Sequence, residues 1–307
     1  MITKIPTACP DLQNISMEGL PRDPAIISAV SGLLTTSRVT PKSFSVDSPL
    51  TQEAYGVLYQ SPDLREVYTV IDGPISLPTI VLPNLTRMGV KFGCNHDWLQ
   101  GFHGASLGRL ALLVFRSESE SIGRFLDAFG RVAFTNSISV TLSTLLFCTS
   151  RSWKPNYRSL LPFTHLTRLD IESSCTPSCS STIDDDTVAD LAQAMSKLEF
   201  LRLGGQPCET PTGVTTKGLS ALAYHCPHLS QLCIHFQLAT LDPPEIPVLA
   251  FSGGPRETCS LTSLEVGYIP LPEESTLMVA LTLLRVFPEL ETINYSDVRW
   301  EKVADAI

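Results

Sequence analysis

One serine in the sequence stands in a pattern typical of hydrolases. Gly104-Ala-Ser-Leu-Gly108 matches G-x-S-x-G, in which the serine follows a strand and begins a helix so that its hydroxyl is exposed. Here the strand-like run Leu107 to Val114 comes after Ser106, so the order of the elements is reversed. We therefore interpret Ser106 as a loop residue, and a hydrolase remains a remote alternative.

A second group has the residue types of a metal site. His225, Cys226, His228, Cys233 and His235 lie within eleven positions, but zinc sites use tighter pairs separated by a loop. Cys226 and His228 belong to a Cys-Pro-His-Leu sequence that ends a helix, while Cys233 and His235 alternate with apolar residues, as on one side of a strand. We predict a buried Cys226 and a surface His235 in place of a zinc site.

Other candidate ligands are weaker still. Cys175, Cys179 and Cys208 read as loop thiols, with a metal site as the alternative. Asp184-Asp-Asp186 lacks the glycine turn and the bidentate glutamate of a calcium loop, and acidic residues suit the start of a helix, where the helix dipole favours negative charge. No phosphate-binding loop or H-E-x-x-H motif occurs. The sequence therefore predicts no catalytic residue, metal or cofactor, and no enzyme.

What the sequence does contain is a repeat. The pattern Leu-x-x-Leu-x-Leu begins at Leu198 and returns 31 residues later at Leu229. A strand, loop and helix unit recurring at such a period indicates a solenoid. Complete and degenerate copies follow one another along the chain: Leu12/Ile15/Met17, Phe44/Val46, Leu64/Val67, Leu85/Met88/Val90, Leu107/Leu110/Leu112, Ile138/Val140, Leu166/Leu169/Ile171, Leu198/Leu201/Leu203, Leu229/Leu232/Ile234, Leu261/Leu264/Val266 and Leu290/Ile293/Tyr295.

Helices are expected in the longer units, and a proline often marks where they stop. Proline ends the preceding helix and extends the residue before it, which fixes where the next strand begins. Spacing at helical period predicts which residues face the core. The expected helices cover 25–34, 119–132, 183–195 (with Val188, Leu191 and Met195 inward), 218–224 and 273–287 (with Leu277, Leu281 and Leu284 inward).

Composition narrows the class of protein. The 307 residues are 43% hydrophobic and 17% charged, which suits a packed core. The net charge of −9 argues against nucleic acid, which needs a basic surface. No apolar run reaches membrane-spanning length, no signal-peptide core follows Met1, and the nine cysteines are an odd number. We expect an intracellular protein, cytoplasmic or nuclear, with reduced thiols and no membrane partner.

The repeats resemble a known family. Cys9-Pro-Asp-Leu12 and Cys226-Pro-His-Leu229, each followed by Leu-x-Leu or a close variant, are similar to the leucine-rich-repeat region of fungal F-box proteins, in the cysteine-containing, ribonuclease-inhibitor-like class. The F-box itself would stand before the repeats, and no Leu-Pro-x-Glu-Ile-type helix pair precedes Cys9. The resemblance implies the substrate-recognition arm of an SCF-type ubiquitin ligase, with adaptor binding only if an upstream F-box exists. A stand-alone ribonuclease-inhibitor-like binding protein is the alternative.

The expected fold is an α/β leucine-rich-repeat solenoid of ten or eleven repeats. It would be one curved domain over residues 1–307, with a parallel sheet on the concave face and helices or irregular turns on the convex face. Residues 237–258 are expected to form a proline-rich rim loop or insertion. Residues 297–307, with Trp300 and Val303, are a candidate C-terminal cap, because terminal repeats need cover.

The strand residues that alternate with the leucines would form the concave face. Phe200 beside Arg168 and Arg202 has the composition of an interface centre, although an ordinary solvated sheet face is the other interpretation. We expect a protein ligand there, of unknown identity. The predicted partner-binding residues are Tyr68, Arg87, Lys91, Arg109, Arg168, Asp170, Glu172, Phe200, Arg202, Gln231, Cys233 and His235.

Overall fold

The computed structural model describes residues 12–36, 40–71, 84–92, 109–115, 127–128, 139–148, 157–175, 183–203, 213–237, 258–266, 271 and 276–307. The chain divides into two compact units, residues 1–144 and 145–307. Both combine parallel strands with helices, so the predicted α/β class is confirmed. The prediction of a single repeat domain over the whole chain stays a prediction. Strand β6 (Ser139–Cys148) lies across the division.

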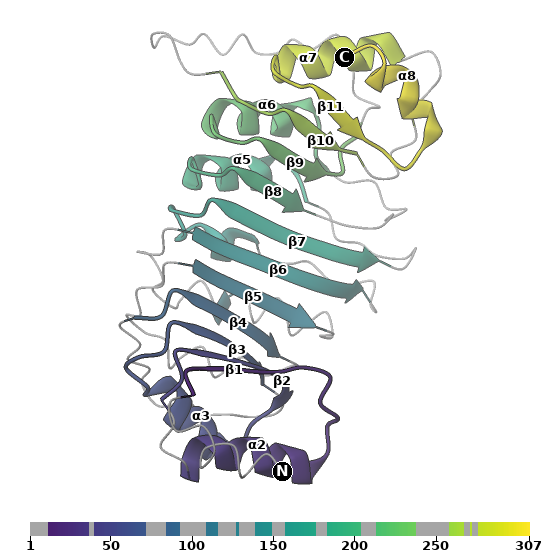
Figure 1. The fold of residues 1–307 in the computed structure, drawn as a ribbon. Coiled ribbons are helices and arrows are strands. Elements are labelled where there is room, and N and C mark those ends of the chain that lie inside the picture. The colour runs from purple at the N-terminus through teal and green to yellow at the C-terminus, as the bar shows by residue number, and fades with distance from the viewer. Residues whose placement is uncertain are drawn as a thin grey trace. The chain divides into compact units, whose positions relative to one another are not determined.

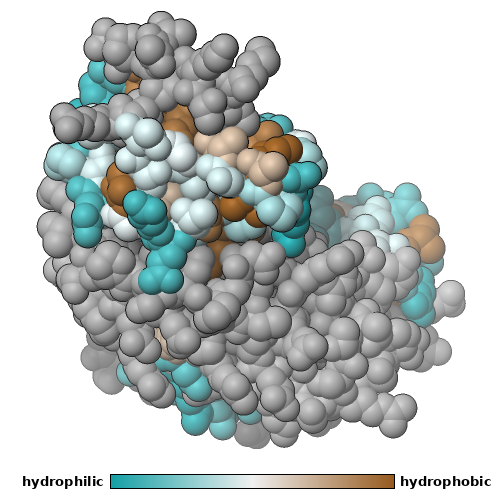
Figure 2. All heavy atoms as spheres, turned by 90° about the horizontal axis from the view of Figure 1, so that it is seen from below, coloured by the Kyte–Doolittle hydropathy of each residue, from teal (hydrophilic) through white to brown (hydrophobic). Residues whose placement is uncertain are grey.

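In the first unit, strands follow one another in sequence order and pair in parallel (Figure 1). Viewed from below, on the side where α2 lies in Figure 1, the described surface is mostly hydrophilic or of intermediate hydropathy (Figure 2). The elements of this unit are β1 (Asn14–Met17), α2 (Pro24–Thr36), β2 (Ser43–Pro49), α3 (Gln52–Tyr59), β3 (Glu66–Ile71), β4 (Arg87–Phe92) and β5 (Arg109–Phe115).

The second unit repeats the same arrangement, with β7 to β11 paired in parallel and in sequence order. Its elements are η3 (Tyr157–Leu160), β7 (Arg168–Cys175), α5 (Asp185–Ala194), β8 (Phe200–Leu203), α6 (Thr216–His225), β9 (Gln231–Ile234), β10 (Ser263–Glu265), α7 (Thr276–Val286), β11 (Thr292–Asn294), η5 (Val298–Trp300) and α8 (Glu301–Ala304). Among the described residues, no helix is long and apolar enough to cross a membrane.

The predicted leucine anchors form the core of the second unit. Strand pairing places one anchor from each strand side by side in a buried row, and every member is at most 7% exposed: Leu169, Leu201, Leu232, Leu264 and Ile293. Burying each such side chain stabilises the fold by about 1.5–3 kcal/mol. On β8 the residues between the anchors, Phe200 and Arg202, stay partly exposed, as the period of a strand requires.

A backbone turn places the first leucine of several repeats. The Leu198 amide donates to the Met195 carbonyl (3.0 Å), and the Leu229 amide donates to the Cys226 carbonyl (3.1 Å). The cysteine of the Cys-Pro-x-Leu sequence also contributes its side chain: the Cys226 thiol lies 3.6 Å from the carbonyl oxygens of both Ala192 and Met195 and donates to them. Cys226 is fully buried, as predicted, and its thiol connects the turn after α6 to the end of α5, the helix one repeat earlier.

The strands are held in register at their first residues by a recurring pair of hydrogen bonds. The carbonyl of Thr167 accepts from the amides of Glu199 (2.8 Å) and Phe200 (3.1 Å). The same two-donor arrangement recurs at six more described strand-start carbonyls: Gln13 with 42 and 43, Lys42 with 65 and 66, Arg65 with 86 and 87, Glu199 with 230 and 231, Ser230 with 262 and 263, and Thr262 with 291 and 292. We call this set of bonds the strand-start ladder. It gives consecutive units the same starting point.

Helix α5 confirms the sequence prediction closely. Val188, Leu191 and Met195 are buried, as predicted. The Asp184 carboxylate caps the helix by accepting from the Thr187 amide (2.8 Å), and these hydrogen bonds, first from the side chain and then from the backbone of Thr187, hold the pKa of Asp184 below its usual value. The acidic run therefore begins a helix, as expected.

The next acidic residue serves the neighbouring helix. The Asp185 carboxylate accepts from the Thr215 amide (2.7 Å), the Thr215 hydroxyl (2.7 Å) and the Gly218 amide (2.8 Å), at the start of α6. A Cβ at position 218 would lie 2.6 Å from the Asp185 carboxylate, so only glycine allows this approach. Helix α6 thus depends on its neighbour α5 for the pairing of amides at its start.

Helix α7 was predicted, but the side expected to face inward was wrong. Leu277 and Leu281 are 65% and 53% exposed, while Leu283 and Val286 are buried. Leu284, the third residue of the predicted stripe, is only partly buried. The sequence Thr-Leu-Met-Val-Ala-Leu-Thr-Leu-Leu-Arg-Val is apolar around most of the helix, so two different stripes fit a helical period equally well and periodicity cannot choose between them.

Helix α3 was not predicted, because the unit that contains it seemed too short for a helix. Thr51 caps it, and its two tyrosines are fully buried and stacked, with ring centroids 6.2 Å apart. The Tyr59 hydroxyl pairs with the Thr69 hydroxyl on β3 at 3.1 Å, which satisfies both buried groups. Its buried residues Ala54, Tyr55, Leu58 and Tyr59 have the spacing of one side of a helix, a pattern present in the sequence.

Residues near the C-terminus pack back into the second unit. Trp300 and Val303, proposed as cap residues, are fully buried. The Trp300 ring meets the Phe236 ring edge to face, with centroids 6.2 Å apart. The other expectations for loops and helices fall mostly on residues outside the described ranges: the proline-rich segment 237–258 is described only at its two ends, and the helix expected over 119–132 only at 127–128, where it is helical.

Candidate binding surface

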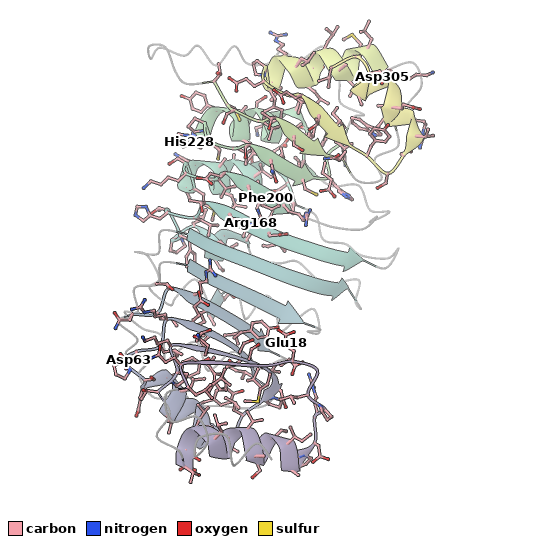
Figure 3. All side chains as sticks on the ribbon, in the orientation of Figure 1. Glu18, Asp63, Arg168, Phe200, His228 and Asp305 are labelled. Carbon is pink, nitrogen blue, oxygen red and sulfur yellow. The ribbon has the colours of Figure 1, made fainter. Side chains whose placement is uncertain are left out.

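The partly exposed side of the sheet in the second unit carries two rows of side chains. Strand pairing brings one residue from each strand into each row. We call the first the open row (Arg168, Phe200, Gln231, Ser263 and Thr292). We call the second the charged row (Asp170, Arg202, Cys233, Glu265 and Asn294). In Figure 3 Arg168 and Phe200 lie next to one another on adjacent strands.

An aromatic ring between two arginines forms the centre of the surface. The Arg168 guanidinium carbon lies 3.5 Å from the centroid of the Phe200 ring, which is stacking distance. The Arg202 guanidinium carbon lies 5.7 Å from the same centroid. The three residues that were predicted as an interface centre are therefore brought together, and both guanidiniums are held by the ring before any partner arrives.

The charged row is a chain of ion pairs. Arg202 lies 3.6 Å from the Asp170 carboxylate on β7 and 3.2 Å from the Glu265 carboxylate on β10. Burial opposes the charged form of Arg202, but the carboxylate of Asp170 and then Cys233 and Glu265 outweigh it, so the pKa of Arg202 is raised. Arg202 is thus fixed across the strands. Glu265, which was not among the predicted site residues, completes the chain of ion pairs.

Cys233 corrects one expectation. It does lie on the same side of the sheet as Arg202, but it is only 7% exposed, so it is not available to a partner. The long Arg202 side chain reaches from β8 to Glu265 on β10 and passes over β9, where Cys233 stands. Strand alternation predicts the side of a sheet correctly, but it does not say which residues neighbouring side chains will cover.

Buried thiols predict a loss of stability at alkaline pH. Burial raises the pKa of Cys226 and of Cys233 to about 12 and that of Cys259 to about 11, from an ordinary value of 9.0. The unfolded chain therefore loses these protons first, so the stabilising contribution is complete below pH 9 and is lost as pH rises toward 11 or 12. We expect a lower urea midpoint at pH 10 than at pH 8.

The control for this prediction is a variant with alanine at positions 226, 233 and 259. Its urea midpoint should change less between pH 8 and pH 10 than that of the wild-type protein, because the groups that titrate differently in the two states are gone. An equal change in both proteins would assign the pH effect to other residues.

Four predicted site residues lie on the first unit, and the structure describes the side chains of two of them, Tyr68 and Arg87. The Tyr68 ring covers Gly89 on the next strand, where an added Cβ would come within 2.5 Å of the ring. Burial first, and then the carboxylates of Asp47 and Glu18, raise the pKa of Tyr68. Arg87 is well exposed and pairs with Glu66 at 3.3 Å.

The remaining predicted residues are placed as follows. Gln231 is exposed at the start of β9, as expected for a contact residue, and His235 follows β9 and is half-buried. Lys91, Arg109 and Glu172 stand on β4, β5 and β7, but their side chains lie outside the described ones. Asp170 is 8% exposed, so it organises the two arginines and is largely shielded from solvent.

The alternative chemical sites find no geometric support in the described part of the chain. No group of three or more histidine, cysteine or acidic side chains that could hold a metal occurs among the described residues. Ser106, Cys179 and Cys208 lie outside the described residues, as does the side chain of Cys175. No protein-family model matches the sequence, and no curated protein is detectably similar to it.

Proposed function

We propose that this chain is a non-catalytic protein-binding module of the leucine-rich-repeat solenoid class, and that it binds its partner on the open and charged rows. The observation that carries the proposal is the stack of Arg168 on Phe200, 3.5 Å apart, beside an arginine fixed by two carboxylates. Aromatic and arginine residues dominate the energies of protein interfaces, and side chains already held in place lose little freedom on binding.

The repeat class is supported by the regularity of the framework. The strand-start ladder gives the same two hydrogen bonds to consecutive strands in both units, and the turns before β3, β7, β8, β9 and β11 are closed by the same backbone hydrogen bond. Such a sheet is the recognition surface of solenoid proteins, where it is concave. By resemblance, the partner would be a protein destined for ubiquitination. The chain would then act as the substrate-recognition arm of an SCF-type ligase and would reach an adaptor only through an upstream F-box.

The second candidate is a stand-alone binding or inhibitor protein of the ribonuclease-inhibitor-like type. It rests on the same surface, because both roles need a partner bound to the two rows. Co-purification with a ligase adaptor would favour the first role, and binding without any adaptor would favour the second.

Site-specific photo-crosslinking tests the proposal directly. A benzophenone amino acid would replace Gln231, which is exposed in the open row, or Gln193, which is exposed on α5. In lysate of the source organism, we expect protein adducts from position 231 and not from position 193. The adducts should fall about thirtyfold in the Phe200→Ala background, the size of a typical hot-spot loss. Equal adducts at both positions, or adducts that ignore Phe200→Ala, would contradict the assignment of the surface.

A further inference from the structure

We propose that the partner presents a carboxylate side chain next to an aromatic or aliphatic one, and that Arg168 binds this carboxylate. The inference rests on the proposed function, which says where the partner binds, and adds what chemistry it must present. Three observations carry it: the unused donors of Arg168, the way the carboxylates of the surface are shared, and the position of the Phe200 ring.

Arg168 has donors to offer. A guanidinium carries five N–H groups in a planar fork. Among the described residues, the Arg168 guanidinium makes no hydrogen bond; its polar contact is the Asp170 carboxylate at 3.5 Å, which is too long for one. Stacking on Phe200 occupies a face of the guanidinium and leaves its N–H edges directed sideways. With the side chain 44% exposed, these edges can receive an acceptor from solvent.

Among the described side chains, Arg168 has no carboxylate of its own. Asp170 is shared, at 3.5 Å from Arg168 and 3.6 Å from Arg202. Glu265 pairs with Arg202 at 3.2 Å and belongs to the far end of the charged row. Among the described side chains, β7 and β8 therefore contribute two guanidiniums and one buried carboxylate to the surface, and a single negative charge from a partner would pair with Arg168.

The charges of the described side chains also favour a carboxylate over a phosphate. A phosphate carries close to two negative charges at neutral pH, and Asp170 and Glu265 would repel the second. A carboxylate matches the fork of a guanidinium with two parallel hydrogen bonds and brings one charge. The ion pairs already present on the surface thus select for an aspartate or glutamate side chain.

Phe200 adds the second requirement. Its ring lies between the two guanidiniums and is still only half-buried. A carboxylate held at the edge of Arg168 places the adjoining partner residue beside this ring. Covering the ring removes apolar area from water, so an aromatic or aliphatic neighbour gains contact energy there and a charged one does not.

A random peptide library displayed on phage supplies the probe. Twelve-residue peptides would be selected on the full chain and counter-selected on its Phe200→Ala variant, so that the retained sequences bind this surface. We expect aspartate or glutamate beside an aromatic or aliphatic residue in the retained sequences. A synthetic copy of one retained peptide should then lose at least about tenfold in affinity when Arg168→Gln is introduced, which corresponds to one charge-assisted hydrogen bond.

Matched variants separate charge from shape. Arg168→Lys keeps the charge but loses the fork and the stack, so we expect an intermediate affinity. Arg158→Gln removes an arginine of comparable exposure that pairs with Asp190 on α5, and it should leave binding unchanged. Replacing the acidic residue of the peptide by its amide should lower the affinity as much as Arg168→Gln does. Combining the two changes should lower the affinity no further, because both remove the same contact. A phosphoserine at that position should bind more weakly than the acid.

The outcomes distinguish the two proposals. Retained peptides that are neutral or basic, or that bind Arg168→Gln as well as the wild-type protein, would overturn the carboxylate inference and leave the binding surface standing. Tighter binding of the phosphoserine peptide would overturn the choice of carboxylate. If every selected peptide also binds Phe200→Ala, the surface itself is wrongly assigned and both proposals fail.

Discussion

Trp300→Ala should lower the free energy of unfolding of the second unit by about 3–5 kcal/mol, the range for large-to-small changes at aromatic core positions. Trp300 is fully buried and meets the Phe236 ring from a segment 64 residues further along the chain (300 − 236). Alanine at this position would leave a cavity beside the Phe236 ring. Urea unfolding followed by circular dichroism measures the change.

Val298→Ala is the matched control for this variant. Val298 stands two residues before Trp300 in the same short helix and is 72% exposed, so its truncation should cost less than about 0.5 kcal/mol. Trp300→Phe should fall between the two variants, because it keeps an aromatic contact and loses volume. A loss below about 1 kcal/mol for Trp300→Ala would mean that the C-terminal segment is not part of the core of this unit.

Asp185→Ala should destabilise the second unit by about 2–3 kcal/mol, the range for lost hydrogen bonds to a charged group. The Asp185 carboxylate pairs with the Thr215 amide, the Thr215 hydroxyl and the Gly218 amide, so its removal takes the acceptor from these three donors at the start of α6. The urea midpoint reports the loss, and amide exchange should show α6 opening more often than before.

The neighbouring aspartate supplies the comparison. Asp186 is 74% exposed at its side chain and pairs with Lys217 at 3.2 Å, so Asp186→Ala should cost less than about 0.5 kcal/mol. Gly218→Ala tests the same cap, because the added Cβ would lie 2.6 Å from the Asp185 carboxylate. It should lower the free energy of unfolding nearly as much as Asp185→Ala. Similar losses for Asp185→Ala and Asp186→Ala would rule out the cap between helices.

The sequence predicted what depends on local periodicity. The leucine anchors, the Pro-marked turns and α5 all follow from spacings within one repeat, because strands alternate and helices turn at fixed periods. Arg168, Phe200 and Arg202 were placed on one side of the sheet by the same rule. The structure aligns equivalent positions of neighbouring repeats, and this brings the three residues together: Arg168 on β7 is paired directly with Phe200 on β8.

What the sequence left undecided depends on contacts between distant residues. Helix α7 is apolar around most of its surface, so the spacing of its apolar residues does not determine which side is buried. The elements that pack against the helix decide this. The partnership of Arg202 with Glu265 spans 63 residues and crosses a strand, and the contact of Trp300 with Phe236 is equally remote. Helix α3 was not predicted for a different reason. The unit that contains it was taken to be too short for a helix, although its apolar residues have helical spacing.

The strand-start ladder also has an evolutionary consequence. Thr167 offers its carbonyl to the amides of Glu199 and Phe200, and Glu199 offers its own to Ser230 and Gln231 in the same way. A deletion or duplication whose ends fall at two such equivalent positions rejoins a donor pair to a carbonyl of the same kind, whereas one whose ends fall at positions that are not equivalent does not. Genes for chains of this kind can therefore gain or lose whole units by unequal recombination while the remaining strands keep their register.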